Sequence, residues 1–574
     1  MLDRFKSKPL DDAKRENHKD IESFLSFKKG CVSLKGKNPC LVALGSKDGR
    51  TIETERVLRV IEQSGVSRSD IRIVQAFQEF PKVGLLFHAK NISPHAFLFA
   101  CVFVQMLNST GFDKIFSECA IVRKCLTGEL VVRDFDVVKR KFEDLFNAAA
   151  PNKSGVTCQS IGALAAQDPE VWAVGVCSVD GQRMSFGDCK QTFTVQSCCK
   201  AVTYCIALEE NGYEKVNRHI GREPSGRRSD EMVLDRRTTP AIPHNPFVNA
   251  GAIMACALVQ PQLETSEERV QYCLKNYWSR LTAMGSETPT YDYITFESEL
   301  VDGDRNRCLT YMMAESKSFP PEVKSGKDLL ENLDFYFKSC SIQQNANSLS
   351  IVAGTLANGG VCPVTGERIF EGETVRDCLS LMYSCGMYDY SGEFAFKIGL
   401  PSKSGAAGAM LVVIPNKMGI CTWSPRLDQN GNSARGLDFL ERLSEQFLFH
   451  IYDRLPSKKT KKLDVGFHKG GDNERDLGTL IEAASQGDIQ AFRLFHNLHG
   501  PEFVNTGDYD GRTALHLACT EGHQKIVEYI VAHPKLSLQA KDRWGTTPLN
   551  DARAANHHKI VSILQQAIAT RTLQ

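Results

Sequence analysis

The chain has 574 residues, of which 42% are hydrophobic, and its 69 basic and 68 acidic side chains give a formal net charge of +1. At about 150 residues per domain, this length predicts three or four domains, and the composition is typical of a globular protein. The balanced charge gives no support for nucleic-acid binding, which usually leaves a basic excess on the protein.

Cysteine usage and hydropathy further restrict the class of protein to which this chain can belong. The 20 cysteines lack the C-x-x-C pairs of zinc sites, and their density is far below that of disulfide-rich secreted domains. We interpret them as reduced packing residues of an intracellular protein. No run of about 18 apolar residues is present, so no transmembrane helix is predicted. The charged start lacks the apolar core of a secretory signal, and acidic side chains among the first 22 residues argue against a mitochondrial presequence.

The amino-terminal part divides into two segments. Residues 1–50 are polar, and we expect them to be loosely ordered. Over residues 51–154 the apolar spacing is helical, and the longest apolar stretch, 96–107, has the length of a buried helix. Since no Asp-x-Asp-x-Asp-Gly calcium loop interrupts this pattern, we interpret the segment as an EF-hand-like helical assembly module without calcium loops.

Residues 155–450 form the largest predicted domain, and strand signals lie near both of its ends. A strand-like run at 171–176 precedes the turn Asp180-Gly181 and a second short strand, which together predict a hairpin. A helix is predicted next, and strand signals return at 409–414 and 420–423. Strands at both sequence ends with helices between them predict an α/β layer in which the two ends share one sheet.

The last part of the chain repeats at a fixed period, after a basic linker at 451–475. Within 476–570, Gly511 and Gly545 are 34 residues apart and lie in similar segments, Asp-Gly-Arg-Thr-Ala-Leu-His and Trp-Gly-Thr-Thr-Pro-Leu. The ankyrin period is about 33 residues, and a degenerate earlier copy starts at Ala483. We therefore predict a short all-α array of ankyrin repeats, near the minimum of about three, and we expect it to bind a protein partner.

Ser197 and Lys200 form an S-x-x-K pair at the start of a helix predicted over 196–210, which places them one turn apart on one face. A serine hydroxyl needs a base, and a lysine can serve when burial or neighbouring positive charge lowers its pKa. The helix N-terminus adds backbone N–H groups that can face a developing oxyanion. The motif alone is a weak signal, because Ser26 and Lys29 also match it. A helix cap beside a surface lysine is the alternative interpretation.

Two further elements distinguish Ser197 from the chance match. Lys403-Ser404-Gly405 precedes the strand at 409–414, and in S-x-x-K hydrolases such a tripeptide lines the substrate cleft. Tyr388 carries a hydroxyl that can relay protons between nucleophile and leaving group, although a packed core tyrosine is the alternative.

Other motifs stand in a fixed order between these elements. They are Pro243-His244-Asn245-Pro246-Phe247-Val248-Asn249-Ala250-Gly251-Ala252, Ser298-Glu299, Gly303-Asp304-Arg305-Asn306, Leu356-Ala357-Asn358-Gly359-Gly360 and Ser384-Cys385-Gly386-Met387-Tyr388. Together with Gln196-Ser197-Cys198-Cys199-Lys200 and the tripeptide at 403, this set resembles the serine-dependent glutaminases over about residues 155–450. The arrangement, with a helical module before and ankyrin repeats after, is similar to the animal kidney- and liver-type members.

The resemblance implies a β-lactamase/transpeptidase-like catalytic domain of the α/β (α+β) class. Its implied reaction is hydrolysis of L-glutamine to L-glutamate and ammonia, without a metal or organic cofactor. Ser197 would attack the side-chain amide, Lys200 would accept its proton, and Tyr388 would assist proton transfer to ammonia. The backbone N–H groups of Ser197 and Ala406 would form the oxyanion hole. The residues implied to bind substrate are Ser197, Asn249, Glu299, Asn306, Tyr336, Tyr388 and Ala406.

These residue types suit a free amino acid. An acid such as Glu299 can hold the α-ammonium group, and asparagine and tyrosine side chains can hold the α-carboxylate. Taken singly, each of these residues has an alternative interpretation as a helix cap, a surface charge or a core residue.

Two segments depart from the family pattern. Ser160 stands where relatives carry a tyrosine that contacts substrate and closes the site, so we expect weaker affinity or a changed response to activators. Residues 226–239 are rich in Arg and Asp where the family's activation loop is rich in Phe and Leu. The resemblance also implies activation by inorganic phosphate through tetramer assembly. Because this loop differs, that implication is less direct for this chain than the implied hydrolytic chemistry.

The resemblance also implies a homotetramer, built as a dimer of dimers, and a mitochondrial location. Because no clear presequence is present, a cytoplasmic location is the alternative. Two other functions stay open: hydrolysis of another amide, such as a β-lactam or peptide, and a non-catalytic ankyrin scaffold that retains the enzyme fold. The substrate set around Glu299 argues against the first, and the intact catalytic motifs argue against the second.

Overall fold

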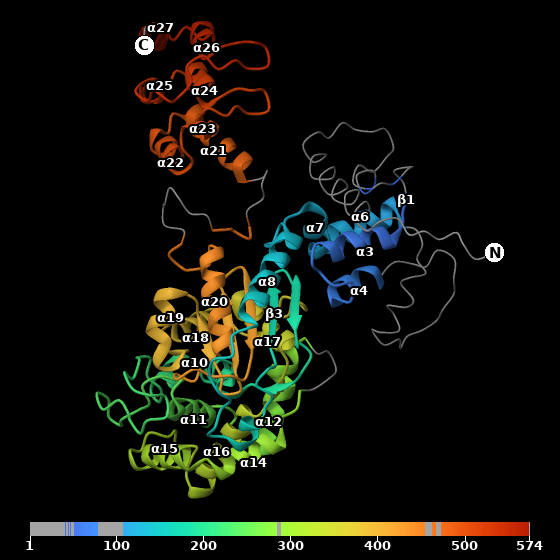
Figure 1. Cartoon of the computed structure of the whole chain (residues 1–574), viewed down its shortest axis with the longest axis vertical. Coiled ribbons are helices and arrows are strands. Elements are labelled where there is room, and N and C mark those ends of the chain that lie inside the picture. Colours follow the sequence, from blue (N-terminus) through green and yellow to red (C-terminus); the bar gives the residue numbers. More distant parts are fainter. Residues whose placement is uncertain are drawn as a thin grey trace, which may run out of the picture. The chain divides into compact units, whose positions relative to one another are not determined.

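The computed structural model describes residues 51–78, 107–283, 289–453, 462–466 and 472–572, together with residues 41, 44 and 46. The chain divides into two compact units, residues 1–451 and 452–574 (Figure 1). The segment predicted to be loosely ordered, 1–50, lies outside the described residues except for those three positions. So does the apolar stretch predicted at 96–107, except for its last residue.

Short helices around a small apolar core form the amino-terminal part of the first unit. They are α3 (Thr54–Gln63), α4 (Ile71–Gln78), α6 (Ser109–Glu118) and α7 (Ala120–Thr127), and β1 (Thr51–Ile52) pairs with β2 (Leu107–Asn108). Val57, Ile61, Phe112, Ile115 and Val122 are buried together in this core. The helical spacing predicted here is confirmed for the described residues, and the two-residue strands are an addition.

Five antiparallel strands form the central sheet of the first unit, in the order β4-β3-β9-β8-β7. The strands are β3 (Ala173–Ser178), β4 (Arg183–Gly187), β7 (Ser402–Ser404), β8 (Ala409–Ile414) and β9 (Met418–Trp423). Strands β3 and β9 come from opposite ends of the domain and pair along their whole length, from Ala173 opposite Trp423 to Ser178 opposite Met418. The prediction that both ends share one sheet is confirmed.

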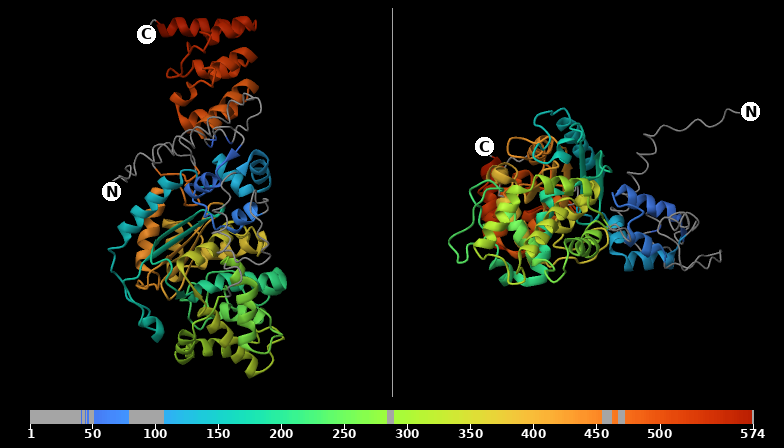
Figure 2. Two further views of the ribbon diagram at one scale, coloured as in Figure 1. Left: turned by 90° about the vertical axis from the view of Figure 1, so that its right-hand side faces the viewer. Right: turned by 90° about the horizontal axis from the view of Figure 1, so that it is seen from below.

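Helices cover both faces of this sheet (Figure 2). On one face α17 (Ala346–Ala357) approaches closely, because Gly175 and Gly419 leave room for it. A Cβ atom at Gly175 would lie 2.3 Å from the carbonyl oxygen of Ala346, and one at Gly419 would lie 2.1 Å from the backbone nitrogen of Gly354. On the other face lie α8 (Phe135–Ala149) and α20 (Ala434–Gln446).

Helix α8 belongs by packing to the sheet, although the sequence placed it in the helical module 51–154. The Phe146 ring stacks on Trp172 with centroids 5.3 Å apart, and the Phe142 ring lies 5.3 Å from that of Phe447. The aromatic side chains of α8 pack against apolar partners on the sheet side of the domain, and their burial holds the helix against the sheet.

The remaining helices of the first unit extend the core beyond α17. They are α9 (Gly162–Ala165), α10 (Cys199–Asn217), α11 (Asn249–Leu258), α12 (Ser266–Cys273), α13 (Ser279–Leu281), α14 (Tyr293–Val301), α15 (Asp304–Glu315), α16 (Gly326–Cys340), α18 (Gly372–Cys385) and α19 (Ser391–Lys397). The short strands β5 (Phe193–Thr194) and β6 (Gln343–Gln344) pair at the start of α10. The predicted helix end near residue 210 marks a break rather than an end, because Gly212 is non-helical and one further turn follows it.

The second unit consists of paired helices around its own core. They are α21 (Asp472–Gln486), α22 (Ile489–His499), α23 (Pro501–Val504), α24 (Ala514–Glu521), α25 (Gln524–Val531), α26 (Pro548–Ala554) and α27 (His558–Thr572). Thr513 and His516 form a capping box at the start of α24, which explains the Thr-x-x-His spacing of the repeat. Leu480, Ala518 and Ile526 are buried in this core.

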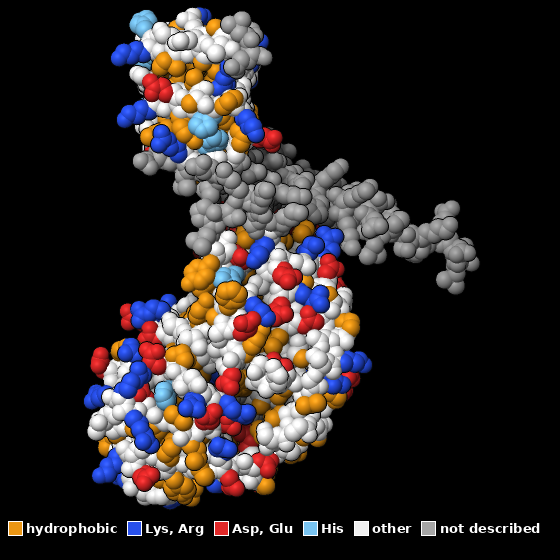
Figure 3. All heavy atoms as spheres, turned by 60° about the vertical axis from the view of Figure 1, so that its left-hand side comes forward, with side chains coloured by type: hydrophobic (Ala, Val, Ile, Leu, Met, Phe, Trp, Pro, Cys, Tyr) orange, Lys and Arg blue, Asp and Glu red, His pale blue; other side chains and the backbone are white. Residues whose placement is uncertain are grey.

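The visible face of the protein carries acidic and basic side chains intermixed, in keeping with the balanced net charge (Figure 3). Within the part of the chain that the structure describes, no helix has the length and apolarity needed to cross a membrane.

Candidate active site

The predicted nucleophile lies at the edge of a cavity of about 530 Å³ in the first unit. Ser197 is the middle residue of a short 3-10 helix, η1 (Gln196–Cys198), that leads directly into α10. Gln196 has a φ of 47°, a left-handed conformation that is uncommon outside glycine. Strand β5 and this turn together place the Ser197 side chain at the cavity, while the side chains on either side of it are buried.

Lys200 lies below the cavity and is almost completely buried. Its Nζ donates to the Asn249 side-chain oxygen at 2.7 Å and to the Phe247 carbonyl at 3.2 Å. Burial lowers the pKa of this lysine, because removing an ammonium group from water disfavours its charged form. A lysine with a lowered pKa can be neutral at working pH and can therefore accept the proton of a serine hydroxyl.

Lys403 forms a second buried amine beside the first. It lies on the edge strand β7, and its Nζ donates to the carbonyls of Ser404 at 2.7 Å and Gly386 at 3.2 Å. Burial, together with the positive charge of Lys200, lowers the pKa of Lys403 to about 7. The sequence indicated Lys403 only as part of a strand edge, whereas the structure places it in the same electrostatic environment as the predicted base.

Tyr388 lies beside these amines and the nucleophile. It starts η3 (Tyr388–Tyr390) with a φ of 53°, its hydroxyl donates to the Ser404 carbonyl at 3.1 Å, and it lines the cavity together with Ser197. Lys403 Nζ lies 4.5 Å from the centroid of the tyrosine ring. Burial raises the pKa of Tyr388, so the phenol keeps its proton and can donate it.

The residues predicted to hold an amino acid line the same cavity. Asn249, at the start of α11, donates from its amide to the Asn306 side-chain oxygen at 3.0 Å. Glu299, on α14, accepts a hydrogen bond of 2.7 Å from the Gln196 side chain, and burial raises its pKa to about 8. Tyr336, on α16, is also buried at this end of the cavity.

Ala406, predicted to contribute to the oxyanion hole, is the second residue after β7. It lines the cavity together with Ser197. The loop can approach the nucleophile turn because residue 405 is glycine: a Cβ atom there would lie 2.8 Å from the Val195 carbonyl. The structure therefore brings together all eight predicted site residues, with Lys200 below the cavity and the other seven on its wall.

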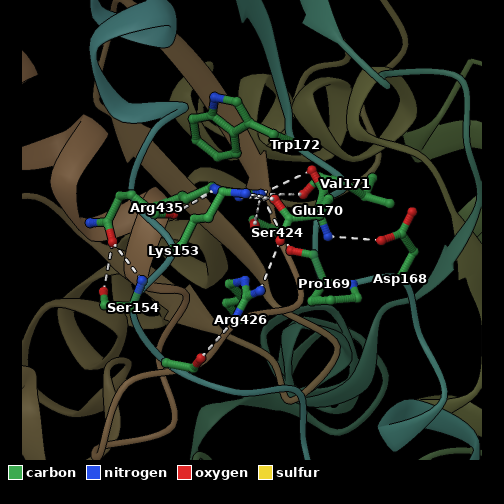
Figure 4. Close-up of polar contacts among 12 residues, drawn as sticks. Lys153, Ser154, Asp168, Pro169, Glu170, Val171, Trp172, Ser424, Arg426 and Arg435 are labelled. Carbon is green, nitrogen blue, oxygen red and sulfur yellow. Dashed lines mark hydrogen bonds and ion pairs between the residues drawn. The ribbon is translucent and has the colours of Figure 1, made fainter.

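Two chain segments that are distant in sequence form the rim of the cavity. Residues 156–161 and 427–431 line it side by side, joined by backbone hydrogen bonds between Val156 and Leu427. Ser160 lies on this rim, where its hydroxyl is 3.3 Å from the Cys158 sulfur. Behind the rim, Glu170 lies between Arg426 and Arg435 (Figure 4).

Sequence reasoning missed several cavity residues. Gln196 was quoted only as part of a motif, and the 427–431 segment gives no stronger signal than its Asp, Asn and Gly turn residues. Arg228 and Asp230, from the segment 226–239, also line the cavity. Among the described residues, no group of three or more His, Cys, Asp or Glu side chains is arranged to hold a metal ion.

Comparisons with known proteins find similarity in both units of the chain. The glutaminase family model matches residues 155–452, and a model of three ankyrin repeats matches residues 480–571. The mitochondrial liver-isoform glutaminase of Mus musculus is 40% identical over 461 residues, which cover 80% of this chain and 74% of that protein. The crystal structure of Mglu in its native form is 32% identical, with a TM-score of 0.51, covering 55% of this chain and 74% of that chain. Mglu in its tris and glutamate form is also 32% identical, with a TM-score of 0.50, over 55% and 68% of the two chains.

Proposed function

Since this chain belongs to the glutaminase family and has its β-lactamase-like fold, we propose that it hydrolyses L-glutamine to L-glutamate and ammonia through an ester on Ser197. One observation carries this proposal: the nucleophile, the proton-relay tyrosine and the amino-acid-binding residues all face a single cavity. The relative Mglu has been solved in a glutamate form, and glutamate is the product expected here.

The proposed acylation step follows from the state of each group. Neutral Lys200 takes the proton of Ser197 as its oxygen attacks the side-chain amide carbon of glutamine. The N–H groups of Ser197 and Ala406 stabilise the oxyanion of the tetrahedral intermediate. Tyr388 passes a proton to the amide nitrogen as the carbon–nitrogen bond breaks and ammonia leaves. Water then attacks the glutamyl ester, and glutamate is released with Ser197 regenerated.

The assignment of Lys200 rather than Tyr388 as the base rests on their opposite pKa shifts. Burial favours the neutral form of both groups, which is the proton-accepting form of an amine but the proton-donating form of a phenol. Tyr388 lines the cavity together with Ser197, which gives the relay its path to the reacting centre. Lys403 lies beside the tyrosine ring, and in its protonated form it would favour the transient negative charge on the Tyr388 hydroxyl.

The test is ammonia release from glutamine by the purified full-length protein. Ser197→Ala should lower kcat by a factor on the order of a thousand or more. Ser26→Ala removes the serine of the other S-x-x-K match and should leave kcat unchanged. Asparagine, one methylene shorter, should be a much poorer substrate.

The contrary outcomes are equally specific. Full activity in Ser197→Ala would exclude the seryl ester. No ammonia release by the unmodified protein over a range of phosphate concentrations would support the non-catalytic scaffold instead.

The wider biology is proposed from relatives and from the domain order. We propose a homotetramer arranged as a dimer of dimers, with inorganic phosphate as its activator, and a protein partner for the ankyrin repeats. The Mus musculus relative is mitochondrial, and we propose the same compartment here, with the cytoplasm as the alternative. Light scattering of the purified protein with and without phosphate tests the assembly and its activator together.

A further inference from the structure

Two buried cysteine side chains meet beside the cavity, and neither has a role in the proposed reaction. Cys199 is the first residue of α10 and Cys340 is the last residue of α16. Their sulfur atoms lie 3.9 Å apart, and both side chains are buried. A disulfide bond is about 2.05 Å long, so a shift of roughly 2 Å would join the two sulfurs.

A small solute can reach one member of the pair, because Cys340 lines the cavity. The buried Cys158 also lines the cavity, but its sulfur contacts the Ser160 hydroxyl rather than a second thiol. We propose that Cys199 and Cys340 form an oxidation-sensitive thiol pair, which hydrogen peroxide entering the cavity converts to a disulfide with loss of activity. The loss of activity, but not the disulfide, rests on the proposed function.

The chemistry balances with one peroxide per pair. The Cys340 thiolate attacks one peroxide oxygen, the oxygen–oxygen bond breaks, and a sulfenic acid and hydroxide form. The Cys199 sulfur then attacks the Cys340 sulfur and displaces hydroxide, which forms the sulfur–sulfur bond. Two thiol protons combine with the two hydroxides, so two water molecules are the only by-products.

Loss of activity follows from where the pair lies. Cys340 is one turn after Tyr336 on α16, and both residues line the cavity. Cys199 lies two residues after Ser197. A disulfide ties the end of α16 to the nucleophile turn, so it displaces both a proposed substrate-binding residue and the nucleophile.

The reaction should be slow at neutral pH and faster in alkali. The hydrogen bond to Cys199 and burial raise the pKa of Cys340, so only a small fraction is thiolate. Lys200 opposes this shift through its positive charge. Because thiolate is the reactive form, the rate of disulfide formation should rise with pH.

The chain provides a matched control in Cys205 and Cys378. Cys205 is also on α10, its pKa is raised by its interaction with Cys378, and both side chains are fully buried. Neither belongs to the cavity wall. If access through the cavity matters, peroxide should join Cys199 to Cys340 well before it joins this second pair.

The experiment treats the reduced full-length protein with hydrogen peroxide, blocks free thiols, and maps cross-linked peptides by mass spectrometry. It uses a Cys308→Ser background, since Cys308 is exposed. We expect a Cys199–Cys340 cross-link with the loss of two hydrogens, a parallel loss of glutaminase activity, and recovery of both by dithiothreitol. Cys199→Ala should keep its basal activity and form no such cross-link.

Two results would overturn the proposal. One is inactivation of the unmodified protein by peroxide without the Cys199–Cys340 cross-link, and the other is cross-linking of Cys205 to Cys378 at an equal rate. If the reduced protein releases no ammonia from glutamine, the proposed function fails, while the peptide map still decides the fate of the thiol pair.

Discussion

To hold an ammonium group as proposed, Glu299 must be charged, yet its surroundings favour the neutral acid. Burial raises its pKa to about 8, while the Gln196 amide and the charge of Lys200 only partly offset this. In the empty site the carboxyl group is therefore mostly protonated at neutral pH. Binding of the substrate ammonium reverses the balance, because an adjacent positive charge favours the carboxylate.

This ionisation predicts how activity changes with pH. As pH rises from 7 to 8, the ionised fraction of a group with a pKa of about 8 grows about fivefold, and kcat/KM should rise with it. The neutral fraction of Lys200 also grows with pH, so both groups act in the same direction. The rise should be larger in kcat/KM than in kcat, because bound substrate holds Glu299 ionised. Steady-state profiles from about pH 6 to pH 9 measure this, and a flat kcat/KM would contradict it.

Ser160 offers a second prediction at the scale of one residue. It lies on the cavity rim at the position where the family resemblance implies a tyrosine, and its short side chain contacts Cys158. Ser160→Tyr should lower the KM for glutamine by about fivefold, which corresponds to one added hydrogen bond worth about 1 kcal/mol. Ser160→Phe supplies the ring without the hydroxyl and separates closure of the site from hydrogen bonding. Unchanged KM and kcat in Ser160→Tyr would show that the missing tyrosine has no consequence here.

At the scale of elements, the rim depends on a carboxylate that does not touch the cavity. Glu170 accepts from Arg426 at 2.8 Å and from Arg435 at 2.9 Å, as Figure 4 shows. Arg435 is buried and also donates to the carbonyls of Asn152 and Glu170. Arg426 directly precedes Leu427, so this ion cluster holds the rim segment in place from behind.

The cluster predicts a change in substrate binding without a change in mechanism. Glu170→Gln removes one acceptor and the negative charge, which should raise the KM for glutamine severalfold and alter kcat less. Two arginines lower the pKa of Glu170 to about 2, so the effect should be the same at every working pH, in contrast to that of Glu299. Lys153→Gln removes only an exposed partner at 3.5 Å and serves as the control. A larger effect on kcat than on KM would indicate that the rim acts on chemistry.

The sequence predicted elements whose signal is local and missed those that depend on long-range contacts. The strand at 409–414 was predicted with the bounds of β8, because a continuous apolar run between turn residues is sufficient. The left-handed backbone of Gln196 could not be predicted, since it depends on the turn between β5 and α10 and on pairing with β6. The environment of Lys403 likewise depends on Lys200, about 200 residues away in sequence.

At the scale of the whole molecule, chemistry and repeats belong to separate units. Every residue that lines the cavity lies between Val156 and Gly431, inside the unit that ends at residue 451. The second unit has its own buried core from Leu477 to Leu564. A unit with its own core can fold independently, and a short repeat array is near the lower limit of stability.

This division predicts the effect of removing the repeats. A chain that ends at Ile451 should fold and keep its kcat/KM for glutamine within about twofold of the full-length value, because no cavity residue is lost. The full-length protein should unfold in two thermal transitions, and the truncated chain should lack the one that belongs to the repeats. Calorimetry and ammonia release measure both, with Ser197→Ala in the truncated chain as the blank. A truncated chain that is folded but inactive would contradict the prediction, because the repeats would then have to act on the cavity.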